Sequence, residues 1–215
     1  PQYTQETFRD LFFGFLVAIV AGLLAVLIRE FGEQVSAVAA KHRAAVLVAV
    51  ALLTGVIAVV VTNVGDVGVN LILFSGENGM GDLLAQTSLA TVLLVVVGKA
   101  LAYALALGGG FRGGPIFPAT YLGVGVGLAA SLLINDLSVS PMAAAAIAAS
   151  VTVLLRLPFT SALLAMLLIG SAGPAVAPFA IIGAVIGFGM RQALDRFDAK
   201  RQAGVDVKGE VVHGS

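Results

Sequence analysis

The chain is divided near its middle by the sequence GGGFRGGPIFP, residues 108–118, which lies between the apolar runs Leu89–Leu107 and Ala119–Ile134. Irregular backbone at membrane depth is tolerated only where protein buries it or where it lines a water-filled cavity. A glycine-rich break that leads into a helix also offers free N–H groups at the positive end of the helix dipole, which favours anions. We therefore predict that residues 108–118 form the functional site of a membrane protein.

The overall composition also indicates a membrane protein. Hydrophobic residues make up 59% of the 215 residues and charged residues 11%, whereas soluble domains contain about 45–50% and about 25%. The apolar residues fill the chain from Leu11 to Met190, so we predict an all-α polytopic membrane protein. The net charge is zero and there is no basic run, so nucleic acid is not expected as a partner.

The sequence lacks the residues that metal chemistry and nucleophilic catalysis require. Cysteine is absent, and His42 and His213 each stand alone, so no disulfide, thiolate nucleophile or metal site is expected. There is no HExxH motif, and no set of serine, histidine and acid occurs at membrane depth. We therefore expect neither a cofactor nor enzymatic activity.

The apolar runs predict five helices near membrane length, at Leu11–Ile28, Ala44–Val61, Leu89–Leu107, Ile116–Ile134 and Pro141–Leu155. The last of these is expected to be short or tilted. The apolar island Val69–Phe74 is too short to cross about 30 Å of hydrocarbon, so we expect a re-entrant or surface helix there. Residues 157–190 are uncharged but divided at residues 170–174 into pieces that are each short for a crossing. Beyond Arg191 we expect a frayed helix followed by coil.

Basic residues near the ends of the spans predict the orientation of the chain. The connection at residues 29–43 carries three basic residues, whereas residues 62–88 carry acidic residues and no lysine or arginine. The positive-inside rule then places the first connection in the cytoplasm and the second outside. Pro1 is then expected outside, a position that is natural if further membrane helices precede it. The predicted organisation is an extramembrane linker at 1–10, a transmembrane domain at 11–194 and a cytoplasmic tail at 195–215.

Three features in or near the break each have alternative explanations. Ala119, Gly123 and Gly127 form a row of small residues, which favours close helix packing in lipid and is compatible with a pore-lining helix. Lys99 lies near the centre of an apolar run; a charge at this depth either attracts anions toward a pathway or pairs with carbonyl groups of a broken helix. Arg112, inside the break, is a candidate for attracting anions, with a solvated loop arginine as the alternative.

Several of these segments together resemble the CLC family of chloride channels and proton-coupled anion antiporters. Residues 113–118, GGPIFP, and the glycine-containing run after them are similar to the family's GGxFxP segment and the following helix. Lys99 falls at the basic position of the preceding helix, and residues 156–160, RLPFT, are similar to a later Arg-x-Pro-x-Thr region. The resemblance extends from about Leu11 to Met190. It implies the carboxy-terminal half of an inverted-repeat fold, with broken and tilted helices.

The resemblance also implies a function and partners. A small inorganic anion such as chloride would cross the lipid bilayer, through an ion channel or a proton-coupled antiporter, and the protein would be a homodimer. We expect it in the cell membrane, as a multi-pass protein of the bacterial plasma membrane. The family's amino-terminal repeat carries GSGIP-like and GREGP-like loops that this sequence lacks, so that repeat is expected as a missing partner of the pathway.

The resemblance assigns roles to particular residues of the break. The implied anion-binding residues are Gly113, Gly114, Pro115, Ile116, Phe117 and Pro118, and Lys99 and Arg112 would act as pathway electrostatics.

Two departures from the family's pattern mark the chain as a divergent branch. Pro115 has no N–H, so we assign the anion donors to Gly114, Ile116 and Phe117. The family's last helix contributes a tyrosine to the anion site, whereas this chain has no tyrosine at residues 185–200. The alternatives that stay open are a secondary transporter of another solute and a non-conducting membrane subunit. An organic anion as that solute would need a wider cavity and more arginines.

Overall fold

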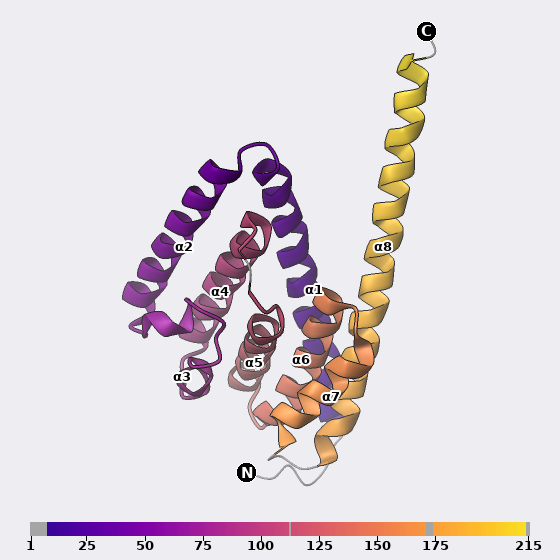
Figure 1. The fold of residues 1–215 in the computed structure, drawn as a ribbon. Coiled ribbons are helices and arrows are strands. Elements are labelled where there is room, and N and C mark those ends of the chain that lie inside the picture. Colours follow the sequence, from indigo (N-terminus) through magenta and orange to yellow (C-terminus); the bar gives the residue numbers. More distant parts are fainter. Residues whose placement is uncertain (1–7, 112, 171–173, 214–215) are drawn as a thin grey trace.

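A computed structural model describes residues 8–111, 113–170 and 174–213; these residues form helices joined by turns and irregular segments, and none of them lies in a strand (Figure 1). This confirms the predicted all-α class. The elements in chain order are α1 (Phe8–Ala39), α2 (Arg43–Gly65), η1 (Val69–Leu71), α3 (Met80–Leu84), α4 (Leu89–Gly109), α5 (Ile116–Leu133), α6 (Val139–Leu155), α7 (Pro158–Leu168), η3 (Pro174–Val176) and α8 (Ala177–His213).

Most of the predicted spans are confirmed as helices of membrane length. The segments long and apolar enough to cross a membrane are Phe8–Ala39, Arg43–Gly65, Leu89–Gly109, Ile116–Leu133 and Pro174–Ala199. The first four correspond to predicted spans. The alanine-rich helix α6 is shorter, with 17 residues, as expected. Pro158 lies in the first turn of α7, where a proline's missing N–H is not needed.

The carboxy-terminal part of the chain differs from the prediction. Pro174–Ala199 is a candidate span of 26 residues, and α8 continues to His213 (Figure 1), whereas we expected a short piece followed by a frayed helix and coil. The prediction was wrong because Arg191 does not end the apolar helix. Its side chain is buried, forms an ion pair with Asp195 at 3.1 Å and donates to the carbonyl of Val153 at 3.3 Å. The helix therefore accommodates the charge and continues.

Helix α6 forms the centre of the bundle. Its residues from Pro141 to Val153 are all buried, and it packs against α1, α5, α7 and α8. Its small side chains allow these helices to approach its backbone closely. The sequence predicted a short or tilted span here, and the structure shows that this helix is covered by other helices.

The small residues of α5 pack directly against α6. A Cβ atom at Gly123 would lie 2.7 Å from the Cα atom of Ile147, and one at Gly127 would lie 2.5 Å from the amide nitrogen of Ala143. Ala119 is buried, and its carbonyl accepts a hydrogen bond from the Ser150 hydroxyl at 3.0 Å. These contacts confirm that the predicted row of small residues is a helix-packing surface.

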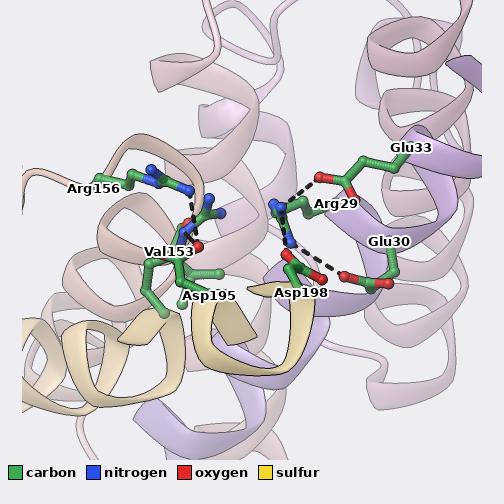
Figure 2. Close-up of polar contacts among 8 residues, drawn as sticks. Arg29, Glu30, Glu33, Val153, Arg156, Asp195 and Asp198 are labelled. Carbon is green, nitrogen blue, oxygen red and sulfur yellow. Dashed lines mark hydrogen bonds and ion pairs between the residues drawn. The ribbon is translucent and has the colours of Figure 1, made fainter. Parts of the chain in front are cut away.

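Ion pairs connect α8 to α1 and to the end of α6 at one end of the bundle (Figure 2). Arg29 of α1 contacts Asp198 of α8 at 3.0 Å and Glu33 of its own helix at 2.6 Å. Arg156, which ends α6 in the left-handed conformation, donates to Asp195 of α8 at 2.8 Å. The network thereby holds α8 against the bundle, beyond the last buried apolar residues.

Two of the three acidic partners that Arg29 has among the described residues, Asp198 and Glu33, provide a matched test of this network. We expect Asp198→Asn to lower the stability by about 1–2 kcal/mol, between the values for exposed and for buried ion pairs, because it removes an inter-helix partner of an arginine that is 15% exposed. Glu33→Gln breaks only an i,i+4 pair within α1, for which about 0.3–0.5 kcal/mol is expected. Thermal unfolding of both variants in the same detergent measures the difference. Equal losses would contradict the inter-helix role of Asp198.

Candidate functional site

The glycine-rich break lies between α4 and α5, and its glycine and proline residues define both helix ends. Gly110 ends α4 in the left-handed conformation, with φ +80°, and its N–H bonds to the carbonyl of Ala106, a role that suits glycine. Helix α5 begins at Ile116 with Pro115 as its N-cap. A proline is tolerated there because the first N–H groups of a helix have no intrahelical partner.

A cavity of about 320 Å³ lies beside the break. This volume far exceeds the minimum of about 10–15 Å³ that one water molecule needs, so the cavity has room for several waters or for a small ion with part of its hydration shell. Its walls come from parts of the chain that are far apart in sequence. The residues that line it are Thr54 of α2, Ile72, Leu73, Phe74 and Ser75 of the segment after η1, Lys99, Ala102, Tyr103, Ala106 and Leu107 of α4, Phe111, Gly113, Gly114 and Pro115 of the break, and Pro118 of α5.

The structure brings most of the predicted anion-binding residues to this cavity. Ile116 and Phe117 are not among the lining residues, and each is 41% exposed. Their N–H groups belong to the first turn of α5, which has no intrahelical partners for them. Arg112 lies outside the described residues. The predicted residues that line the cavity are Gly113, Gly114, Pro115 and Pro118, together with Lys99.

The ammonium group of Lys99 is buried at the cavity wall and fully hydrogen-bonded. Lys99 is 2% exposed, and its Nζ donates to the carbonyl oxygens of Ile72, Leu73 and Phe74 at 2.9, 3.1 and 2.9 Å. An ammonium group has three donors, so all of them are used. Nζ also lies 5.1 Å from the ring centroid of Tyr121, within the range of a cation–π interaction. The carbonyl pairing considered for Lys99 is therefore present, and its charge remains beside the cavity.

The segment that Lys99 holds is not the helix that the sequence predicted. Only the single 3-10 turn η1 forms at Val69–Leu71, and the chain then continues irregularly through Phe74 and Gly76, with φ +59° and +91°. A Cβ at Gly76 would lie 2.7 Å from the Tyr121 ring. The prediction of a re-entrant or surface helix was wrong because Lys99, rather than helical N–H groups, donates hydrogen bonds to the carbonyls of residues 72–74.

Three hydroxyl side chains at the cavity were not predicted from the sequence. They belong to Thr54, Ser75 and Tyr103, and the Tyr103 hydroxyl donates to the carbonyl of Pro115 at 3.3 Å. Tyr103 follows Lys99 by four residues, which places both on one face of a helix, so this spacing was a usable signal. Thr54 and Ser75 carry no comparable signal because they reach the cavity only through tertiary packing.

The electrostatic character of the cavity favours an anion. The amino-terminal end of α5 contributes the positive end of a helix dipole, and the charge of Lys99 adds to it. None of the described lining residues is acidic. A small anion in this cavity would meet hydroxyl and N–H donors without meeting a carboxylate.

The comparison with known families agrees with this geometry. The sequence matches the family model described as "Voltage gated chloride channel" over residues 3–192, which include α4, the break and every residue that lines the cavity. No curated protein and no solved structure matches the chain. The chain therefore belongs to the voltage-gated chloride channel family, whose members carry anions across membranes.

Proposed function

We propose that this protein carries a small inorganic anion such as chloride through the cavity beside residues 108–118. The observation that carries the proposal is the meeting of Gly113–Pro115, the amino-terminal end of α5 and the Lys99 ammonium at one cavity. The N–H groups of Gly114, Ile116 and Phe117 would replace part of the hydration shell of the anion. Such a site conducts only if it also binds the anion weakly enough to release it.

Lys99 and Arg112 would raise the local concentration of anions at this site. Because all three donors of the Lys99 ammonium are bonded to carbonyl groups, Lys99 would act through its charge rather than by direct hydrogen bonding to the anion. The backbone N–H groups of the break would make the direct contacts.

We further propose the assembly that the family resemblance implies. Residues 11–194 would form the transmembrane domain of a homodimer in a bacterial plasma membrane, with residues 1–10 as an extramembrane linker and residues 195–215 in the cytoplasm. An amino-terminal repeat would complete the other side of the pathway. Large apolar side chains on α2 are exposed, as expected of a helix that faces lipid or another membrane helix.

Anion efflux from liposomes that contain the purified protein tests this function. Chloride and fluoride electrodes, used with and without a protonophore, distinguish the two halides and separate a channel from a proton-coupled antiporter. We expect efflux of at least one halide. Absence of both fluxes from folded, dimeric protein would contradict the proposal and favour another solute or a non-conducting subunit.

Pro115 provides a test of the proposed donor assignment. We expect Pro115→Ala to raise the anion affinity by about two- to tenfold, the effect of one added hydrogen bond, because alanine restores an N–H at the start of α5. Isothermal titration of the purified protein with chloride measures the change. Unchanged affinity in a correctly folded variant would contradict the assignment of Gly114, Ile116 and Phe117 as the donors.

A further inference from the structure

Helix α4 presents Lys99 and Tyr103 to the cavity one turn apart, and each binds backbone carbonyl groups of a different wall. Lys99 holds the segment after η1, and Tyr103 holds Pro115 at the start of α5. We infer that these two side chains are positioning residues that make the cavity selective for anions, by binding carbonyl oxygens that would otherwise attract cations. The inference rests on the proposed function, because it concerns the same cavity.

The wall of the cavity that is bonded to Lys99 offers the kind of oxygen ligands that a cation site uses. The carbonyl oxygens of three consecutive residues, Ile72, Leu73 and Phe74, converge on one nitrogen at 2.9–3.1 Å. Groups of backbone carbonyls that converge on one point coordinate potassium ions in selective channels. Here a covalently attached ammonium takes the place of the ion. Removal of the ammonium would leave three carbonyl oxygens beside the cavity without this donor, that of Ile72 in a buried contact and those of Leu73 and Phe74 in partly buried ones. This is unfavourable unless water or a cation binds there.

A second part of the cavity wall, at Pro115, has a single carbonyl oxygen that is bound by a side chain of α4 in a similar but weaker way. The carbonyl of Pro115 accepts the Tyr103 hydroxyl at 3.3 Å and the N–H of Ala119 at 3.4 Å, both long hydrogen bonds. The Tyr103 contact links the start of α5 to α4. Loss of the hydroxyl would free part of one carbonyl and loosen the glycine-rich break at the place where the anion is proposed to bind.

A role of Lys99 as a direct anion ligand predicts different behaviour. Its three donors are used by carbonyl groups, so no N–H is left for an anion. If its positive charge alone mattered, loss of the lysine would weaken anion binding without creating a cation site. The appearance of cation binding is therefore the result that distinguishes the two explanations.

Four variants of the full protein test the inference: Lys99→Met, Lys99→Arg, Tyr103→Phe and Tyr121→Phe. Tyr121 is the matched control, because among the described residues its buried hydroxyl has no hydrogen-bond partner, so its removal breaks no hydrogen bond. The first measurement is the shift in melting temperature of each purified variant when potassium replaces choline as the cation of the chloride buffer. The second is the anion-to-cation permeability ratio in liposomes under a potassium chloride gradient.

We expect Lys99→Met to gain stabilisation by potassium that the wild type lacks, and to lose at least about 100-fold in its preference for anions, since a full charge and three charge-assisted hydrogen bonds are removed. Lys99→Arg should largely retain the preference because its guanidinium still donates to carbonyls. Tyr103→Phe should lose about two- to tenfold, as expected for one neutral hydrogen bond. Tyr121→Phe should match the wild type in both measurements.

Three results would overturn the inference: a folded Lys99→Met variant that potassium does not stabilise, one that keeps its anion preference, or a Tyr121→Phe variant as strongly affected as Tyr103→Phe. If Lys99→Met does not fold, Tyr103→Phe decides, and an unchanged anion preference in that variant overturns the inference. A wild-type protein that carries no halide would instead contradict the proposed function. The thermal measurement would still report whether a cation site forms.

Discussion

Replacement of Gly183 by alanine is expected to destabilise the bundle by about 3 kcal/mol or more, at the upper end of the range for overpacking. Gly183 lies in α8, where its Cα packs directly on the backbone of α6. An added Cβ would collide with the carbonyl oxygen of Ala145 and would lie 3.0 Å from the Ala145 Cα atom. Backbone atoms cannot rotate away as a side chain does, so α8 would have to move from the core helix.

Gly189, in the same helix, provides the matched control for this substitution. A Cβ at Gly189 would have no atom within 4 Å beyond its chain neighbours and the nearby backbone of its own helix, and alanine is favoured over glycine in a helix by about 0.5–1 kcal/mol. We therefore expect Gly189→Ala to leave the melting temperature unchanged or slightly raised. Thermal unfolding of both variants in detergent measures the contrast. Equal effects at the two positions would show that α8 does not pack on α6 through Gly183.

A negative charge at Gly114 is expected to abolish anion movement while leaving the fold intact. Gly114 lines the cavity, and a Cβ there would have no other atom within 4 Å, so a side chain can be added without a steric clash. A carboxylate about 5 Å from an anion repels it by about 3 kcal/mol at an effective dielectric constant of about 20. Chloride efflux through Gly114→Asp should therefore be at least about 100-fold slower than in the wild type.

Gly114→Asn separates the effect of this charge from the effect of volume. Asparagine has nearly the same shape as aspartate but carries no charge, so its efflux should stay within about tenfold of the wild type if electrostatics dominates. Size-exclusion profiles and melting temperatures of the two variants should be alike. Rapid chloride efflux through Gly114→Asp would mean that the anion does not pass Gly114.

The features that the sequence predicted correctly depend on local chemistry. Apolar runs of sufficient length form helices that satisfy their own backbone groups in lipid, which explains the spans α1, α2, α4 and α5. Glycine and proline residues act at their own positions, so Gly110 ends one helix and Pro158 begins another. The i,i+4 spacing of Ala119, Gly123 and Gly127 places them on one helix face, and they therefore predicted a packing surface.

The features that the sequence did not predict depend on partners that are remote along the chain. Val69–Phe74 is apolar enough for a helix, but Lys99, at least 25 residues later, supplies the donors that let most of it stay irregular. The sequence predicts the end of a span at Arg191, but Arg191 forms an ion pair with Asp195 and donates to the carbonyl of Val153, and α8 continues. In both cases the partners of a buried basic side chain include backbone carbonyls of another segment, which only the tertiary structure brings close.

The sequence by itself determined the class of this protein, four of the five helices of membrane length that the structure describes and the position of the glycine-rich break, because each follows from chain-local hydrophobicity and backbone freedom. Only the tertiary structure decided which helix forms the core and which residues complete the cavity. In the sequence, the alanine-rich segment of α6 cannot be distinguished from the other apolar runs. In the structure, α6 packs against four helices and is buried. Thr54, Ser75 and Tyr103 meet the break only because α2, α4 and the segment after η1 converge there. Burial and convergence are properties of helix packing, which composition and periodicity do not encode.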